Sequence, residues 1–203
     1  MVSMAAITDI TSNERRVLRY FAEILDYPQD SLIDALRSCE ALVPLEPRLL
    51  LSEFRGLVQT MPLGRLQELY AGTFDWDTTF PLHLGYYLLG ENYKRSVFLT
   101  ELKARYRAQG FEMAGTTELP DHLPVILRFL SLCRDETLSR ELIVEAILPA
   151  LDRMFGGKSS EGQERAAHPY AGVFQALQQV LRSQIGELSS DLATASQGGG
   201  NYA

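Results

Sequence analysis

Apolar residues recur at helical spacing along almost the whole chain, and this periodicity constrains the fold more than any single motif does. No segment shows the sustained alternation of apolar and polar residues that a half-buried strand needs. Prolines and glycines separate the helical stretches from one another. The sequence therefore predicts an all-α fold, a single-domain helical bundle. The expected helices cover about residues 12–26, 30–43, 47–60, 62–72, 79–89, 92–109, 120–132, 137–155 and 169–185.

The domain organisation follows from length and composition. A chain of 203 residues can bury roughly 70% of its unfolded surface, which is enough for one sizeable core. We expect a flexible N-terminus over 1–11, one all-helical domain over 12–187 with a mobile loop at 156–168, and a disordered tail over 188–203. Within the domain, Ser12 or Asn13 is expected to cap the first helix, and Pro149 to kink the eighth.

The charge of the chain restricts its partners. The formal net charge of −7 argues against nucleic acid and anionic lipid, both of which select basic surfaces. A basic peptide is a better match. No stretch approaches the roughly 20 apolar residues of a membrane span, and no signal peptide is recognisable at the N-terminus. We therefore expect a soluble, cytoplasmic protein without stable membrane association.

Residues that could carry catalysis or bind metal are scattered. Cys39 and Cys133 flank no ligand pattern and are expected to be buried, idle thiols. His83, His122 and His168 are some forty residues apart, and none lies at helical spacing from another metal ligand. The sequence contains no phosphate-binding loop, dinucleotide fingerprint or nucleophile elbow. We expect no metal and no cofactor.

One candidate site is the Asp121-His122 pair, which lies between Pro120 and Pro124 at the start of an apolar helix. The unpaired N–H groups there favour a carboxylate, and an imidazole can titrate near neutrality. The pair could serve a small helical enzyme with His122 as general base, although no nucleophile lies in a recognisable context. It could also cap the helix, or form the edge of a peptide-binding groove.

A second candidate is an aromatic group in the middle of the chain. Such residues usually belong to the core. However, Phe74 and Trp76 alternate with Asp75 and Asp77, a mixture of apolar anchors and carboxylates that suits an amphipathic basic peptide. Core packing and peptide binding both remain open for this group, whose members are Tyr70, Phe74, Trp76, Phe80, Tyr86 and Tyr87.

A series of short motifs runs in the same order as in a known family. It comprises Leu25-Asp26-Tyr27-Pro28, Tyr70-Ala-Gly-Thr-Phe74-Asp75, Tyr86-Tyr87, Gly90-Glu91, Lys94-Arg95, Gly110-Phe111, Glu118-Leu-Pro-Asp-His-Leu-Pro124 and His168-Pro-Tyr170. Over about residues 15–185 the chain resembles the NarJ family, the delta-subunit chaperones of respiratory nitrate reductase. That family lies within the wider TorD/DmsD group of redox-enzyme maturation proteins.

The resemblance implies an all-helical protein that is not an enzyme. Such a protein binds the N-terminal segment of an apo-molybdoenzyme catalytic subunit and assists molybdenum cofactor insertion, with cofactor biosynthesis proteins as further candidate partners. In the wider group the Asp-His and aromatic motifs contribute to peptide binding. Carboxylates would then meet basic residues of the client, and aromatic side chains would line an apolar groove. The candidate client-binding residues are Glu118, Pro120, Asp121, His122, Tyr70, Phe74, Trp76 and Tyr87.

Two points of the motif series depart from the family. Gly90-Glu91 replaces a Gly-Asp sequence, and Arg128 stands where an acid follows the Asp-His motif. These departures leave the client open among nitrate, ethylbenzene, dimethyl sulfide, chlorate and selenate oxidoreductases. A scaffold subunit of a stable complex is a further alternative. If His122 contacts the client, the affinity should change between about pH 6 and 7.5.

Overall fold

The described part of the chain is built from helices, in agreement with the predicted all-α class. The structure, a computed structural model, describes the backbone of residues 4–76, 81–113, 117–155 and 167–197. Within these ranges there is no strand, only an isolated antiparallel bridge between His83 and His122. The elements are α1 Met4–Ile24, α2 Leu32–Glu40, α3 Leu45–Val58, α4 Leu63–Phe74, α5 Leu84–Leu89, α6 Tyr93–Ala108, α7 Leu123–Leu132, α8 Glu136–Glu141, a π-helical segment η1 Leu142–Ile147, α9 Leu148–Phe155 and α11 Ala171–Gln197.

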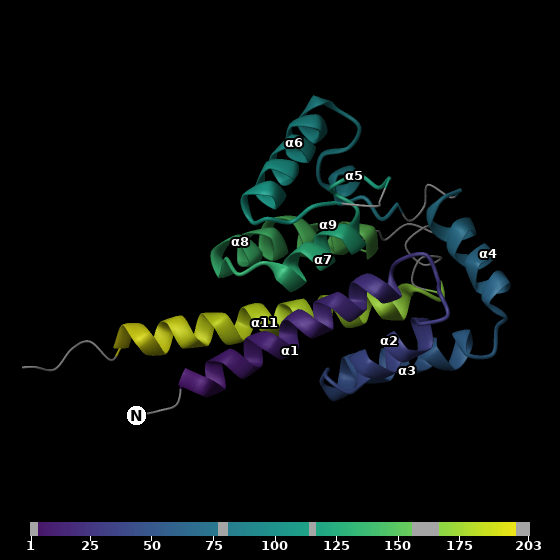
Figure 1. Cartoon of the computed structure of the whole chain (residues 1–203), viewed down its shortest axis with the longest axis horizontal. Coiled ribbons are helices and arrows are strands. Elements are labelled where there is room, and N and C mark those ends of the chain that lie inside the picture. Colours follow the sequence, from purple (N-terminus) through teal and green to yellow (C-terminus); the bar gives the residue numbers. More distant parts are fainter. Residues whose placement is uncertain (1–3, 77–80, 114–116, 156–166, 198–203) are drawn as a thin grey trace, which may run out of the picture.

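Helix α7 packs against α1, and in Figure 1 it lies between the α1–α11 pair and α6. Helix α1 packs against α7 and α2, while α3 packs against α2 and α11. Helix α5 contacts α6, α9 and η1. The central place of α7 agrees with its sequence, which is apolar on nearly all sides. Its buried residues are Leu123, Pro124, Val125, Ile126, Leu127, Phe129 and Leu130.

Several helix boundaries differ from those expected. Helix α1 begins at Met4, so Ser12 and Asn13 lie inside the helix and do not cap its start. Helix α11 continues beyond Ile185 to Gln197. The predicted flexible N-terminus, domain limits and disordered tail remain predictions. Residues 156–166 of the predicted mobile loop, and 198–203 of the tail, lie outside the described residues.

The helix predicted from about residue 79 starts later, at Leu84. Residues 77–80 lie outside the described residues, but residues 81–83 are not helical. His83 is extended, with φ −92° and ψ 109°, and precedes the first helical residue. The apolar run that favoured a long central helix is therefore divided between an extended segment and a short helix.

The helix predicted over 137–155 contains a π-helical turn just before Pro149, and the kink expected there remains a prediction. In η1 the N–H of Leu148 bonds to the carbonyl of Ile143, five residues back. Because Pro149 has no N–H, the next α-helical bond, to the Glu145 carbonyl, cannot form. The proline thus disturbs the helix on its N-terminal side, where the wider π turn lies.

None of the helices that the structure describes is both long enough and apolar enough to cross a membrane.

Candidate functional site

Two extended segments far apart in the sequence meet next to α7. The N–H of Leu84 bonds to the Asp121 carbonyl at 2.9 Å, and the N–H of Leu123 bonds to the Leu82 carbonyl at 2.8 Å. These bonds form the bridge between His83 and His122, whose ring centroids lie 5.3 Å apart. The start of α5 and the start of α7 are therefore held together at this point.

The carboxylate of Asp121 is fully buried and caps a helix other than its own. Its Oδ2 accepts from the backbone N–H of Gly85 at 3.1 Å and from Nη2 of Arg95 at 3.3 Å. Its Oδ1 lies 3.3 Å from Nδ1 of His83. Gly85 is the second residue of α5, whereas the residue that precedes α7, His122, makes no side-chain cap. Asp121 thus holds the N-terminus of α5 and does not present its charge to solvent.

The charge on Asp121 is stabilised by its neighbours. Burial alone would raise the pKa of this carboxyl group, because desolvation disfavours the charged form. The hydrogen bond and charge of His83, the charge of Arg95 and the N–H of Gly85 outweigh that effect, so the pKa lies below its usual value. Asp121 is therefore an ionised structural group at neutral pH.

The prediction that His122 titrates near neutrality is wrong. The side chain is only 6% exposed, and its Nδ1 has no hydrogen-bond partner in the part of the chain that the structure describes. Burial, together with the nearby His83, lowers the pKa of His122 from 6.5 to about 4, and the charge of Asp121 only partly opposes this. The imidazole is neutral between pH 6 and 7.5, so its titration cannot change client affinity there.

His122 instead makes the stability of the fold sensitive to mild acid. The unfolded chain protonates this imidazole below about pH 6.5, whereas the folded chain keeps it neutral down to about pH 4. The unfolded state therefore binds more protons in this window, and stability falls as the pH falls through it. We expect the melting temperature of wild type to fall more steeply from pH 6.5 to 4 than that of His122→Gln. Equal slopes for the two proteins would contradict the assignment.

The remaining residues of the Glu118–Pro124 motif differ in exposure. Pro120 is buried, and its carbonyl accepts the hydroxyl of Tyr106 at 2.8 Å. Glu118 is exposed, and its neighbour Leu119 is 42% exposed. Glu118 also lies close enough to Tyr70 to contribute to the raised pKa of that phenol, after burial, Tyr170 and Asp75. The exposed end of the motif is thus near the aromatic group of α4.

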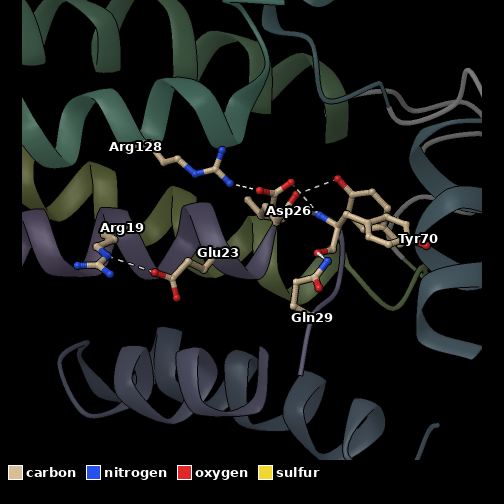
Figure 2. A network of polar contacts seen from close by, with 8 residues as sticks. Arg19, Glu23, Asp26, Gln29, Tyr70 and Arg128 are labelled. Carbon is tan, nitrogen blue, oxygen red and sulfur yellow. Dashed lines mark hydrogen bonds and ion pairs between the residues drawn. The ribbon is translucent and has the colours of Figure 1, made fainter. Parts of the chain in front are cut away.

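Of that aromatic group, Tyr70 lies in the core, and Phe74 and Tyr87 are partly buried against it, while Phe80 lies outside the described residues. Tyr70 is 4% exposed, and its hydroxyl donates to the Leu25 carbonyl at 3.2 Å (Figure 2). Its ring lies 4.8 Å from that of Phe74 and 6.3 Å from that of Tyr170. Phe74 is half-buried and also packs against Tyr170, at 4.9 Å. These rings join α4 to the end of α1 and the start of α11.

Accessible aromatic side chains follow α4 and α1 and also lie on α5, where Tyr86 is 39% exposed. Trp76 follows the end of α4 and is 84% exposed, and Tyr27 is 43% exposed with its ring 5.6 Å from that of Tyr70. Tyr87 is half-buried on α5. Of the eight candidate residues, the structure therefore leaves Glu118 and Trp76 exposed and Phe74 and Tyr87 partly so, while Pro120, Asp121, His122 and Tyr70 lie inside.

An ion pair that sequence reasoning missed connects the motifs. Arg128 of α7 binds Asp26, whose Oδ1 also accepts the backbone N–H of Tyr27 at 2.9 Å (Figure 2). Burial lowers the pKa of Arg128, with an opposing effect of the nearby Glu23. Arg128, which departs from the family pattern, thus links α7 to the Leu25–Pro28 motif through an ion pair. The sequence offered one sign of this ion pair, the opposite charges of Asp26 and Arg128. Because these residues are 102 positions apart, nothing in the sequence indicated that they are in contact.

Groups for redox or metal chemistry are not assembled in the described residues. Both cysteines are buried free thiols, as expected, and burial raises the pKa of Cys39 to about 12. Across the described ranges, no three His, Cys, Asp or Glu side chains are grouped so that they could hold a metal ion.

Comparison with known proteins agrees with the resemblance found in the sequence. The family model for the nitrate reductase delta subunit matches residues 40–151. The chain is 27% identical to a probable nitrate reductase molybdenum cofactor assembly chaperone, NarW, of Escherichia coli K12, over 88% of this chain and 72% of the relative. It is 28% identical to the assembly chaperone NarJ of the same strain, over 84% of this chain and 68% of the relative.

A solved structure supports the fold. A redox enzyme maturation protein from Archaeoglobus fulgidus aligns with a TM-score of 0.55 at 21% identity, over 83% of this chain and 93% of that one. At this identity the likeness concerns the fold alone. The family model, by contrast, covers more than half of the sequence, and the chain therefore belongs to the nitrate reductase delta subunit family.

Proposed function

We propose that the protein is a cytoplasmic, system-specific chaperone that binds the N-terminal segment of an apo-molybdoenzyme catalytic subunit. In this role it assists molybdenum cofactor insertion and assembly of a nitrate reductase-like complex. The observation that carries the proposal is the likeness to NarW and NarJ over most of the chain, because both relatives are molybdenum cofactor assembly chaperones. Those relatives are not catalysts, in agreement with the expectation that this chain is not an enzyme.

The accessible residues of the candidate site support peptide binding. Trp76 exposes 84% of its surface, and large exposed aromatic side chains are enriched at interfaces and often dominate their energetics. Asp75 and Glu118 are exposed near the same aromatic cluster. We name Trp76, Asp75, Glu118 and the exposed Leu119 the α4 edge. Its apolar anchors and carboxylates suit an amphipathic, basic segment of a client.

The buried candidates have a different role in this proposal. Asp121, His122, Pro120 and Tyr70 cannot contact a client without leaving the core, because each is enclosed by the bundle. They act by positioning α5, α7 and α4 around the accessible surface. Phe74 and Tyr87, which are half-buried, would contribute apolar walls.

Trp76→Ala is expected to weaken client binding about tenfold, because truncation of a central aromatic anchor removes its contact area. The measurement is titration calorimetry with N-terminal peptides of the catalytic subunits of molybdenum oxidoreductases encoded in the same genome. Tyr93→Ala is the matched control, since Tyr93 is an equally exposed aromatic residue, 81% exposed, on α6. Equal affinities for wild type and both variants would exclude the α4 edge.

The chaperone role itself has a separate test. A chaperone should leave after assembly, whereas a scaffold subunit would remain. Stoichiometric retention of this chain in the purified mature oxidoreductase, or failure of the wild-type chain to bind the peptide at any accessible concentration, would overturn the proposed function.

A further inference from the structure

A cleft of about 530 Å³ lies beside α6, and none of its lining residues is among the eight candidate residues. It is bounded by α5, α6, α8, η1 and α9, and its size is within the roughly 300–1,000 Å³ typical of ligand sites. Its floor is apolar and draws on α5, α6, η1 and α9. The apolar lining residues are Leu88, Leu89, Phe98, Leu102, Leu142, Ala146 and Pro149.

The positive charges at the rim of this α5–α6 cleft are already engaged. Nη1 of Arg105 lies 2.7 Å from Oε1 of Glu141. Nη1 of Arg153 donates to the carbonyls of Tyr87 and Leu88, at 2.7 and 2.9 Å, at the C-terminal end of α5. Neither guanidinium group is therefore available to an anionic ligand without loss of an existing interaction.

Two rim carboxylates, in contrast, are free. Glu101 of α6 and Glu145 of η1 are exposed, and neither pairs with a cation in the part of the chain that the structure describes. The cleft thus offers hydrogen-bond acceptors and negative charge around an apolar floor. Such a surface complements a cationic, amphipathic partner.

We infer that the α5–α6 cleft seats a short amphipathic segment of the client, with apolar anchors on the floor and a Lys or Arg at Glu101 and Glu145. The inference rests on the proposed function and adds to it a second contact surface. Apolar side chains one helical turn apart can enter such a groove together. The flanking cations would then reach the two carboxylates on opposite walls.

The structure also explains how the cleft is kept open for such a segment. The capping carboxylate of Asp121 fixes the N-terminus of α5, and Arg153 binds its C-terminal carbonyls. The wall formed by Leu88 and Leu89 is therefore held at both ends before any client arrives. A preformed wall lowers the ordering cost of binding.

A charge-reversal experiment tests the inference. The double variant Glu101→Lys/Glu145→Lys should bind the N-terminal client peptide identified by calorimetry at least about tenfold more weakly than wild type. Replacing the basic residues of the peptide by Glu should restore part of the lost affinity to this variant while weakening binding to wild type. Glu46→Lys/Glu53→Lys is the matched control, because it makes the same charge change at exposed positions of α3.

The outcomes separate this inference from the proposed function. Unchanged affinity of the cleft variant, beside weakened binding of Trp76→Ala, would overturn the inference and leave the function standing. Weakening without rescue by the altered peptide, or equal weakening by the α3 control, would also overturn it. A change of oligomeric state in the cleft variant alone would assign the cleft to a second copy instead. Absence of peptide binding by wild type would overturn both.

Discussion

Asp121→Ala is expected to lower the free energy of unfolding by about 3–5 kcal/mol, the usual cost of removing one partner of a buried ion pair. The substitution leaves the N–H of Gly85 and the side chains of His83 and Arg95 without their shared acceptor. These groups are largely enclosed, so water cannot fully replace the carboxylate. Urea denaturation followed by circular dichroism measures the loss.

Two comparisons isolate the effect at Asp121. Asp152→Ala removes an exposed carboxylate that pairs with Arg182, and it should cost no more than about 1 kcal/mol. Asp121→Asn keeps the shape but not the charge. Because the pKa of Asp121 is lowered in the folded chain, its charge stabilises the fold above about pH 4, and this contribution is lost as the pH falls further. Asp121→Asn should therefore lose this part of the acid sensitivity. Similar losses for Asp121→Ala and Asp152→Ala would contradict the buried cap.

Gly85→Ala is expected to cost about 2–3 kcal/mol, near the upper end for an extra methyl group in a packed site. A Cβ at this position would lie 2.7 Å from Oδ2 of Asp121 and 3.2 Å from Cγ of Arg95. The carboxylate cannot move away without breaking its bonds to the start of α5. Thermal unfolding of the variant measures the cost.

Gly72→Ala makes the same chemical change, but it is expected to raise the stability of the fold. Gly72 lies within α4, and a Cβ there meets nothing within 4 Å. Alanine is the better helix former, so this variant should gain about 0.5–1 kcal/mol. If both variants changed stability in the same direction, the close approach of Asp121 to Gly85 would be disproved.

The fold class was predictable because helical periodicity is a local property. The all-α class and the central place of α7 both followed from where apolar residues recur. Asn92 likewise caps α6 through the N–H of Lys94, and Gly110 adopts φ +70° after its end, as a stop signal should. Local chemistry decides each of these features.

Other features depend on contacts between distant residues and could not be obtained in this way. The apolar run up to Leu89 looks helical throughout, yet residues 81–83 pair with the segment before α7. The π turn of η1 was not predicted, since a proline specifies only that a bond is missing and not how the helix adapts. Tertiary packing decides both outcomes.

The candidate site illustrates the same limit. The sequence identified the Asp-His motif, but it could not tell that the carboxylate of Asp121 turns inward and accepts from Gly85, 36 residues earlier. The sequence showed only that Arg128 departs from the family pattern. It did not show that this residue forms an ion pair with Asp26 in the fold. The α5–α6 cleft was not predicted at all, because its lining comes from five elements whose meeting is a property of the whole bundle.

The six-residue length of α5 has a consequence for the order in which the protein folds. A helix this short does not persist alone in water, because it has too few internal hydrogen bonds to offset nucleation. Asp121 binds its N-terminal end through Gly85, from which it is 36 residues away in the sequence. Arg153 binds its C-terminal end through the carbonyl of Tyr87, from which it is 66 residues away. Contacts over such separations form after local ones. We therefore expect α5 to become stably helical during synthesis only after residue 153 has been made.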